Sequence, residues 1–228
     1  MKHIRNITLA ILISVFSSSY ALAEFTMGIS GAVANIGASG TEIEGGERNS
    51  KSIDYQTVIG SIFVEANDVA GSGVTLGIDY IPLSADVSDN VKKRTDTELS
   101  VTGTADHTST TRNQSAQAEL NDHLTFYAMM DMTSDLYVKV GYVHVDLETT
   151  ENLATGSKYG NTDVNGLLIG IGTEYDIANG IARLEFSHTN YEDIDLSSSV
   201  KRTGVSPNNK IEAQLDVTQI KASYGYKF

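Results

Sequence analysis

The last nine residues, "IKASYGYKF" (220–228), alternate between two kinds of side chain. One parity is apolar or aromatic and consists of Ile220, Ala222, Tyr224, Tyr226 and Phe228. The other parity is Lys, Ser and Gly. Successive side chains of a strand point to opposite faces, so this pattern predicts a β-strand with one apolar and one wet face. Soluble domains usually fray at a terminus, which makes a large apolar side chain on the last residue unusual.

The first 23 residues have the layout of a secretory signal peptide. Lys2 and Arg5 precede the apolar run "ITLAILISVF", and the small residues "ALA" precede Glu24. The alternative is an uncleaved helical anchor, but the apolar run is short for a helix that spans a bilayer. We therefore expect an exported mature domain, 24–228.

The composition of this domain excludes several classes of protein. It contains no Cys, which excludes disulfides and thiolate metal sites. A helical membrane protein is also excluded, because no mature segment approaches twenty apolar residues. Removing Lys2 and Arg5 takes the net charge from −13 to −15, which disfavours binding to nucleic acid.

Alternation predicts eight strands, each close to the ten residues that a tilted strand needs to cross a bilayer. They are 24–35, 55–66, 73–83, 118–130, 135–145, 165–175, 181–191 and 220–228. The parity of the second strand is ambiguous, since Val58, Ile62 and Val64 compete with Ile59 and Phe63.

The connections between these strands alternate in length. Long polar loops are expected at 36–54, 84–115, 146–163 and 192–210, and tight turns at 67–72, 131–134 and 176–180. Transmembrane barrels have short periplasmic turns and long outer loops. The sequence therefore predicts an all-β, eight-stranded antiparallel up-and-down transmembrane β-barrel in the outer membrane, with both termini periplasmic.

A soluble β-sandwich is the alternative, since its strands also alternate. The face opposite the apolar one favours the barrel, because it combines many Gly with charged side chains, as a polar lumen does. These lumen candidates are Asp79, Glu119, Lys139, Glu174, Arg183, Glu185 and Lys221.

The signal peptide, "LYVKVGYVHV" (136–145), "GLLIGIGTEYDIANGIARLEFSHTNY" (166–191) and "ASYGYKF" (222–228) resemble small eight-stranded outer membrane barrels of Gram-negative bacteria, of the OmpA-transmembrane and opacity-protein type. The resemblance implies that Ile220, Ala222, Tyr224, Tyr226 and Phe228 form the signal read by the barrel assembly machinery. The chain departs from the family pattern in having no Trp for the interfacial belts.

A barrel of eight strands is filled by its own side chains, so free diffusion of solutes is not expected. Buried charges need partners, which predicts that the lumen candidates form a network of ion pairs. Rearrangement of these pairs would open a thin ion path, so a small gated channel is the alternative.

A lipid-modifying enzyme at the outer rim is a third hypothesis, based on His188 beside Ser187. Neighbouring residues of a strand face opposite sides, which argues against a catalytic pair and favours a non-enzymatic protein. His123, His144 and His188 lie on three strands without metal-ligand spacing, so no metal site and no cofactor are predicted.

The resulting hypothesis is a structural or surface-interacting barrel that displays four long loops outside the cell. Its expected partners are outer membrane lipids and lipopolysaccharide, the assembly machinery and an extracellular ligand of the loops. The acidic loops are expected to attract divalent cations loosely, which would bridge them to lipopolysaccharide phosphates.

Overall fold

The computed structural model describes residues 24–44, 47–87, 91–99, 109–152, 158–199 and 209–228. The predicted signal peptide, 1–23, lies outside the described residues. Within the described part, no helix has the length and apolar character needed to span a membrane.

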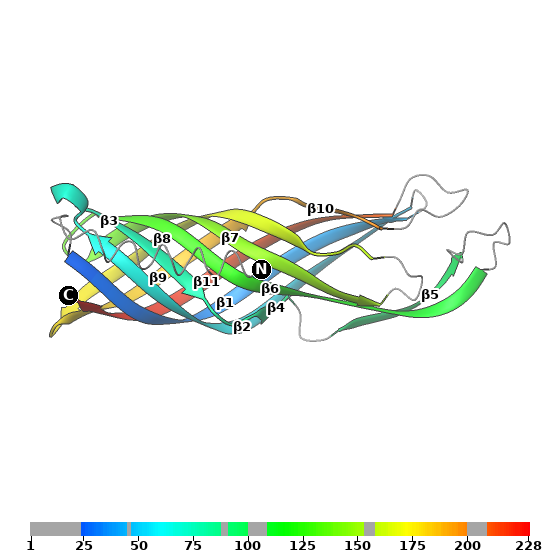
Figure 1. The fold of residues 1–228 in the computed structure, drawn as a ribbon, viewed down its shortest axis with the longest axis horizontal. Coiled ribbons are helices and arrows are strands. Elements are labelled where there is room, and N and C mark those ends of the chain that lie inside the picture. Colours follow the sequence, from blue (N-terminus) through cyan, green and yellow to red (C-terminus); the bar gives the residue numbers. More distant parts are fainter. Residues whose placement is uncertain (1–23, 45–46, 88–90, 100–108, 153–157, 200–208) are drawn as a thin grey trace.

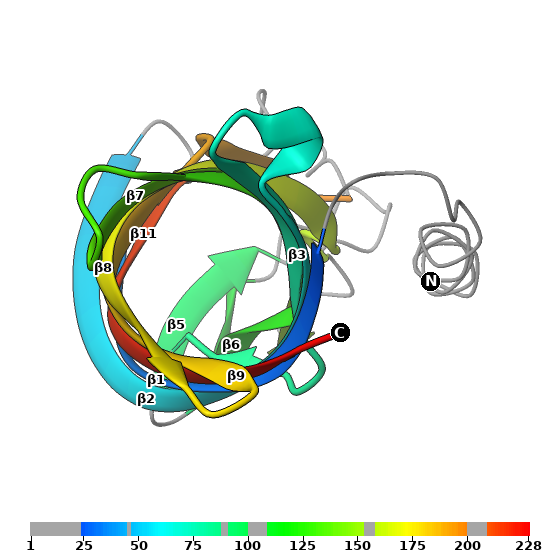
Figure 2. The same cartoon turned by 90° about the vertical axis from the view of Figure 1, so that its left-hand side faces the viewer.

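Eight long strands form a closed antiparallel ring in the order β1-β2-β3-β6-β7-β8-β9-β11. Their bounds are Glu24–Glu44 (β1), Glu47–Asn67 (β2), Val74–Ile81 (β3), Ser109–Asp131 (β6), Leu136–Asn152 (β7), Thr162–Ile177 (β8), Gly180–Tyr191 (β9) and Lys210–Lys227 (β11). β1 pairs with both β2 and β11, which closes the barrel seen end-on in Figure 2. The predicted eight-stranded antiparallel barrel is confirmed.

Three short strands extend this ring without adding to it. β4 (Ala85–Asp86) and β5 (Lys92–Leu99) pair with β6 and continue the line of β3. Pro82 follows β3 directly and has no N–H for the ladder, which accounts for the break there. In the same way, β10 (Ile194–Ser197) pairs with β11 and continues the line of β9.

The tight turns gather at one end of the barrel, on the left in Figure 1, together with the start of β1 and the C-terminus. We call this the terminus end, and the opposite end, where β5 and β10 lie, the distal end. The first turn contains a short 3-10 helix, η1 (Val69–Gly71). The other two join β6 to β7 and β8 to β9.

Three of the four segments predicted as long loops, 36–54, 84–115 and 146–163, contain long stretches of β-strand, so the strands there are longer than predicted. Within 36–54, Ile36 to Glu44 of β1 pair with Glu47 to Tyr55 of β2. β4, β5 and the start of β6 occupy much of 84–115, and β10 lies within 192–210. The barrel wall therefore continues well beyond the predicted membrane-crossing strands (Figure 1).

An apolar belt surrounds the terminus half of the barrel. Each ring strand contributes outward side chains that are between 39% and 80% exposed: Ile29, Val58, Leu76, Phe126, Val140, Ile169, Phe186 and Ile220. On β2 the outward set includes Val58 and Ile62, while Phe63 is buried inside, which settles the parity of that strand. A belt of this kind matches the hydrocarbon layer of a bilayer.

In the distal half the apolar side chains change sides. The buried lumen residues there include Ile36, Leu120, Val143, Val145, Leu168, Leu215 and Val217. The outward positions of the same strands become polar, as Asn35 and Thr218 illustrate on the paired strands β1 and β11. This half is built like a soluble barrel, with water outside and an apolar interior.

Candidate functional site

A cluster of charged side chains fills the lumen of the terminus half. We call it the ion-pair cluster; it consists of Glu65, Asp79, Lys139, Glu174, Arg183, Glu185 and Lys221. Arg183 on β9 lies at its centre, with Nη1 2.5 Å from Glu65 Oε1 and Nε 2.6 Å from Glu174 Oε2. Since Glu65 comes from β2, the first pair crosses the lumen.

Two further ion pairs complete the cluster. Lys221 Nζ on β11 lies 3.0 Å from Asp79 Oδ2 on β3, and Ser61 donates a hydrogen bond to the same oxygen. Lys139 Nζ on β7 lies 3.1 Å from Glu185 Oε2 on β9. Both pairs are at most 8% exposed at the side chain. Such pairing offsets the cost of removing these charges from water.

Two tyrosines support the cluster, and each lies against a glycine. The Tyr127 hydroxyl donates to Glu65 Oε1 at 2.6 Å, and the Tyr137 hydroxyl donates to Glu185 Oε2 at 3.0 Å. A Cβ at Gly77 would overlap the Tyr127 ring, and one at Gly172 would overlap the Tyr137 ring. Glycine on the inner wall therefore provides the room that these two rings occupy.

Six of the seven predicted lumen residues meet in the cluster, and Glu119 does not. A bulge at Asn121 to Leu124, with Asp122 at φ 48°, adds one residue to β6. The extra residue reverses the parity of the strand, so Leu120 is buried inside and Glu119 pairs with Glu148 on the opposite face. The placement of Glu119 in the lumen is therefore corrected.

Glu65 belongs to the cluster, although the sequence did not single it out. It is 1% exposed and receives hydrogen bonds from Tyr127 and Arg183. Glu65 shares its parity with Phe63, and the sequence pattern of β2 did not distinguish the two faces. A charged residue opposite the Val58 and Ile62 face is the signal that would have identified it.

On the distal side of the ion-pair cluster, the lumen is packed with apolar side chains. The layer draws on most ring strands and includes Ala34, Ile36, Val143, Leu168, Tyr191 and Val217, each 8% exposed or less. The residual cavity recorded at this level measures about 30 Å³. In the described part of the chain, paired ions and then this apolar layer occupy the lumen from the terminus end upward.

The distal end opens into an apolar cavity of about 560 Å³ inside the barrel. Its lining includes Ala38, Ile53, Val87, Leu147, Leu196 and Leu215. This size lies within the range of small-molecule pockets in proteins.

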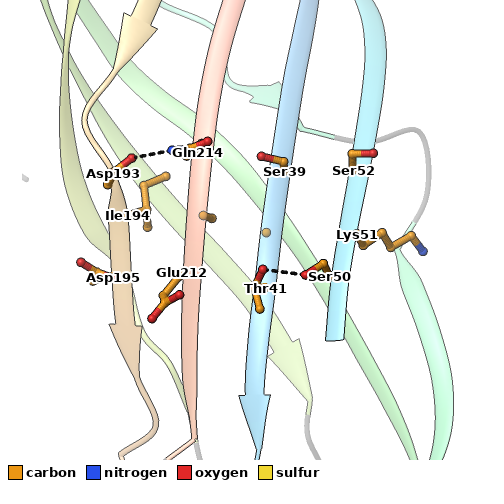
Figure 3. Close-up of a pocket in the computed structure, with 12 residues that line it drawn as sticks. Ser39, Thr41, Ser50, Lys51, Ser52, Asp193, Ile194, Asp195, Glu212 and Gln214 are labelled. Carbon is orange, nitrogen blue, oxygen red and sulfur yellow. Dashed lines mark hydrogen bonds between the residues drawn. The ribbon is translucent and has the colours of Figure 1, made fainter. Parts of the chain in front are cut away.

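The outer face of the distal half carries a polar groove of about 590 Å³ between β10, β11, β1 and β2. Figure 3 shows hydroxyl and carboxylate side chains along it, including Ser39, Thr41, Asp193 and Glu212. Gln214 donates a hydrogen bond to Asp193 at 3.1 Å, and the hydroxyls of Thr41 and Ser50 are 2.8 Å apart. Asp193, Asp195 and Glu212 line the groove together with Lys51, and Glu212 is paired with Arg48 at 2.7 Å.

His188 and Ser187 lie on opposite sides of β9. His188 Nδ1 is 2.9 Å from Thr218 Oγ1 on the neighbouring strand. Ser187 is buried in the lumen and accepts a hydrogen bond from Gln219. His123 lies 3.0 Å from the Tyr191 hydroxyl. The structure therefore does not bring Ser187 and His188 together.

Of the five alternating residues of the C-terminus, Ile220, Ala222, Tyr224 and Tyr226 lie on the outward face of β11, and Phe228 follows the last residue of the strand. Ile220, Tyr224, Tyr226 and Phe228 are 45% to 70% exposed. The rings of Tyr226 and Phe228 meet edge to face, with centroids 5.1 Å apart. The Phe228 amide donates to the Phe25 carbonyl at 2.8 Å, so the last residue is held against β1.

No family model and no curated protein matches the chain. Solved structures that are similar include the outer membrane protein OprG of Pseudomonas aeruginosa (13% identity, TM-score 0.48, covering 90% of this chain and 96% of that one). Others are the outer membrane protease OmpT of Escherichia coli (10%, 0.46, 93% and 99%) and Ail of Yersinia pestis, solved with the heparin analogue sucrose octasulfate (11%, 0.43, 90% and 99%). The closed ring of eight strands and its apolar outer belt make the chain a small outer membrane β-barrel.

Proposed function

We propose that the chain is a non-conducting outer membrane barrel whose distal half projects from the cell and binds partners there. The observation that carries this proposal is the content of the lumen. Ion pairs cross it in the terminus half, and an apolar layer with buried side chains follows above them. A water-filled ion path would require both layers to open. No reaction is assigned, since Ser187 and His188 face opposite sides of the wall.

The distal surface is the part of the barrel offered to a partner. Its strands continue past the apolar belt, and the polar groove in Figure 3 runs along their outer face. Hydroxyls and carboxylates there fit a basic or polyhydroxylated ligand, whereas the acidic charge disfavours polyanions. The proposed display therefore includes an extended strand surface within the segments predicted as long loops.

A second candidate function is binding of a small apolar molecule inside the distal cavity. The specific observation is its volume of about 560 Å³ together with its aliphatic lining. This function is compatible with a closed lumen, because the cavity lies above the apolar layer.

In this proposal, export removes residues 1–23, both termini are periplasmic, and lipopolysaccharide surrounds the outer rim. The barrel assembly machinery recognises Ile220, Ala222, Tyr224, Tyr226 and Phe228. Their outward position on the last strand of the ring supports this role, because it leaves them available before the barrel closes.

Cysteine labelling tests the orientation, since the natural chain has no Cys. Ser50→Cys places a thiol on the exposed distal face, and Ser72→Cys places one in the first tight turn. A membrane-impermeant maleimide should label Ser50→Cys on intact cells and Ser72→Cys after the outer membrane is permeabilised. The reverse pattern would contradict the proposed orientation.

Planar bilayer recordings test the closed lumen. The purified barrel should give no stable conductance steps at neutral pH, and the double variant Lys139→Met/Glu185→Leu should also remain silent because the apolar layer persists. Regular conductance steps from the wild-type barrel would favour the gated channel instead.

Two binding assays distinguish the groove from the cavity. A glycan array tests whether the groove binds a polyhydroxylated ligand. Displacement of a fluorescent fatty acid tests whether the distal cavity binds a small apolar molecule.

A further inference from the structure

Three potential metal ligands meet on the outer wall just above the apolar belt. His144 and Asp146 lie on β7, and Asp163 lies on β8. One ligand atom from each falls within 4.8 Å of the other two. Tyr142 and Leu167 are the last outward apolar residues of the two strands before this group, which we call the rim cluster. It was not predicted, because the partners of His144 come from its own strand and from its neighbour in the ring.

The imidazole of the rim cluster is held in one orientation. His144 Nδ1 lies 3.0 Å from Asn165 Oδ1, and the amide nitrogen of Asn165 donates to Glu192 at 3.4 Å. The amide oxygen of Asn165 can accept but not donate, so Nδ1 carries the proton. The lone pair of Nε2 then faces Asp146 Oδ1, 3.6 Å away. Metal-binding histidines are commonly oriented by a hydrogen bond of this kind.

Among the described residues, no Lys or Arg forms an ion pair with either carboxylate of the rim cluster. Asp146 and Asp163 are direct partners in the β7–β8 register, where like charges repel. Asp146 is 9% exposed, and its Oδ1 has no hydrogen-bond partner among the described residues. A buried carboxylate oxygen that lies close to an imidazole lone pair is an arrangement that a bound cation would stabilise.

The surroundings add negative charge. Asp122 follows Asn121, which is the partner of Asp146 in the β6–β7 register, and the Tyr80 hydroxyl donates to its carboxylate at 2.8 Å. A divalent cation would offset the repulsion among these carboxylates, because it attracts Asp146 and Asp163 at once.

We propose that His144, Asp146 and Asp163 bind one divalent transition-metal ion of the Zn²⁺ class. One imidazole nitrogen and two carboxylates form a ligand set suited to Zn²⁺, whereas Ca²⁺ and Mg²⁺ prefer oxygen ligands throughout. Three protein ligands leave a coordination position that faces away from the barrel at the level of the lipid headgroups. This inference goes beyond the proposed function and does not depend on it.

Isothermal titration tests the site in the tag-free mature barrel, refolded in detergent and stripped with a chelator. ZnCl₂ should bind with a stoichiometry of one, and CaCl₂ and MgCl₂ should bind more weakly. Asp146→Asn and His144→Gln should each abolish the binding. Asn165→Ala should weaken it about 10- to 100-fold, as loss of an orienting partner does. CoCl₂ should give the visible absorption of a nitrogen- and oxygen-bound ion, and Asp146→Asn should remove it.

The matched control is His188→Gln, which removes an outward histidine bonded to Thr218 rather than to carboxylates. It should bind ZnCl₂ like the wild type. Gel migration without heating shows that each variant is folded. The proposal is overturned if the wild type binds no Zn²⁺, if Asp146→Asn and His144→Gln bind it unchanged, or if Ca²⁺ binds more tightly than Zn²⁺. If the wild type binds no Zn²⁺ and the Asp146 carboxyl is protonated at neutral pH, Asp146 and Asp163 share a proton and the metal site is excluded.

Discussion

Val217 and Ile220 lie three residues apart on β11 and face opposite sides of the barrel wall. Ile220 points outward and is 57% exposed, whereas Val217 points into the lumen and is 8% exposed. The same exchange occurs on β1, where Val33 is outward and Ile36 is inside. Because the apolar side changes while the strand continues, the solvent around the barrel must change at this level, from hydrocarbon to water.

A charge placed in the belt should therefore be costly. Ile169→Arg puts a guanidinium into the belt and should destabilise the barrel by about 2–4 kcal/mol in lipid vesicles. Ser39→Arg, on the outward face of the distal half, should change the stability by less than about 0.5 kcal/mol. Urea unfolding, followed by tyrosine fluorescence or by gel migration, measures the stability of both variants. Equal effects of the two variants would contradict the position of the belt.

Breaking one ion pair of the lumen should destabilise more than removing it entirely. Lys221→Met leaves Asp79 buried without its cation and should cost about 3–5 kcal/mol. The double variant Lys221→Met/Asp79→Leu removes both charges and should recover most of that loss. The free energy of unfolding in vesicles tests the pair, and a double variant no more stable than the single one would show that the two charges are not coupled.

Room for the Tyr127 ring is a separate requirement. Gly77→Ala would place a Cβ within that ring, displace it and weaken its hydrogen bond to Glu65. We expect a loss of about 1–3 kcal/mol, as for overpacking in a core. Gly31→Ala is the control, since nothing lies within 4 Å of its Cβ. If both variants unfold at the same urea concentration, the ring does not depend on the glycine.

The last residue should matter for assembly in the cell rather than for the finished barrel. Phe228→Ser should reduce the heat-modifiable, folded fraction in outer membranes, while the purified variant should still fold in detergent. The backbone hydrogen bond from residue 228 to Phe25 does not depend on the side chain. An equal defect in cells and in detergent would indicate a structural role instead of recognition by the assembly machinery.

The sequence was sufficient for the membrane-crossing part because each wall residue there repeats one rule, apolar outside and polar inside. It placed Asp79, Lys139 and Lys221 in the lumen for that reason. Their partners were not assignable, since the pairing of Lys221 with Asp79 requires ring closure between β1 and β11. Glu119 was misplaced because one additional residue at Asp122 reverses the alternation, and a tolerated left-handed Asp leaves little trace in the sequence.

The distal half was missed for a different physical reason. Its strands obey the opposite rule, with small or aliphatic residues inside and Ser, Thr and Asp outside. On β1, Ala38 and Gly40 face the lumen while Ser39 and Thr41 face water. Because apolar side chains are expected to face outward in a membrane-crossing strand, the polar outward positions of this segment suggest a loop.

Probe accessibility along β11 tests the change of solvent most directly. Single cysteines at the outward positions 214, 216, 218, 220, 222 and 224 would be spin-labelled in lipid vesicles, with collision rates measured for oxygen and for a water-soluble nickel chelate. We expect the nickel chelate to dominate through Thr218 and oxygen to dominate from Ile220 onward. Uniform access of the nickel chelate to all six positions would contradict the membrane belt, and uniform access of oxygen would contradict the projecting distal half.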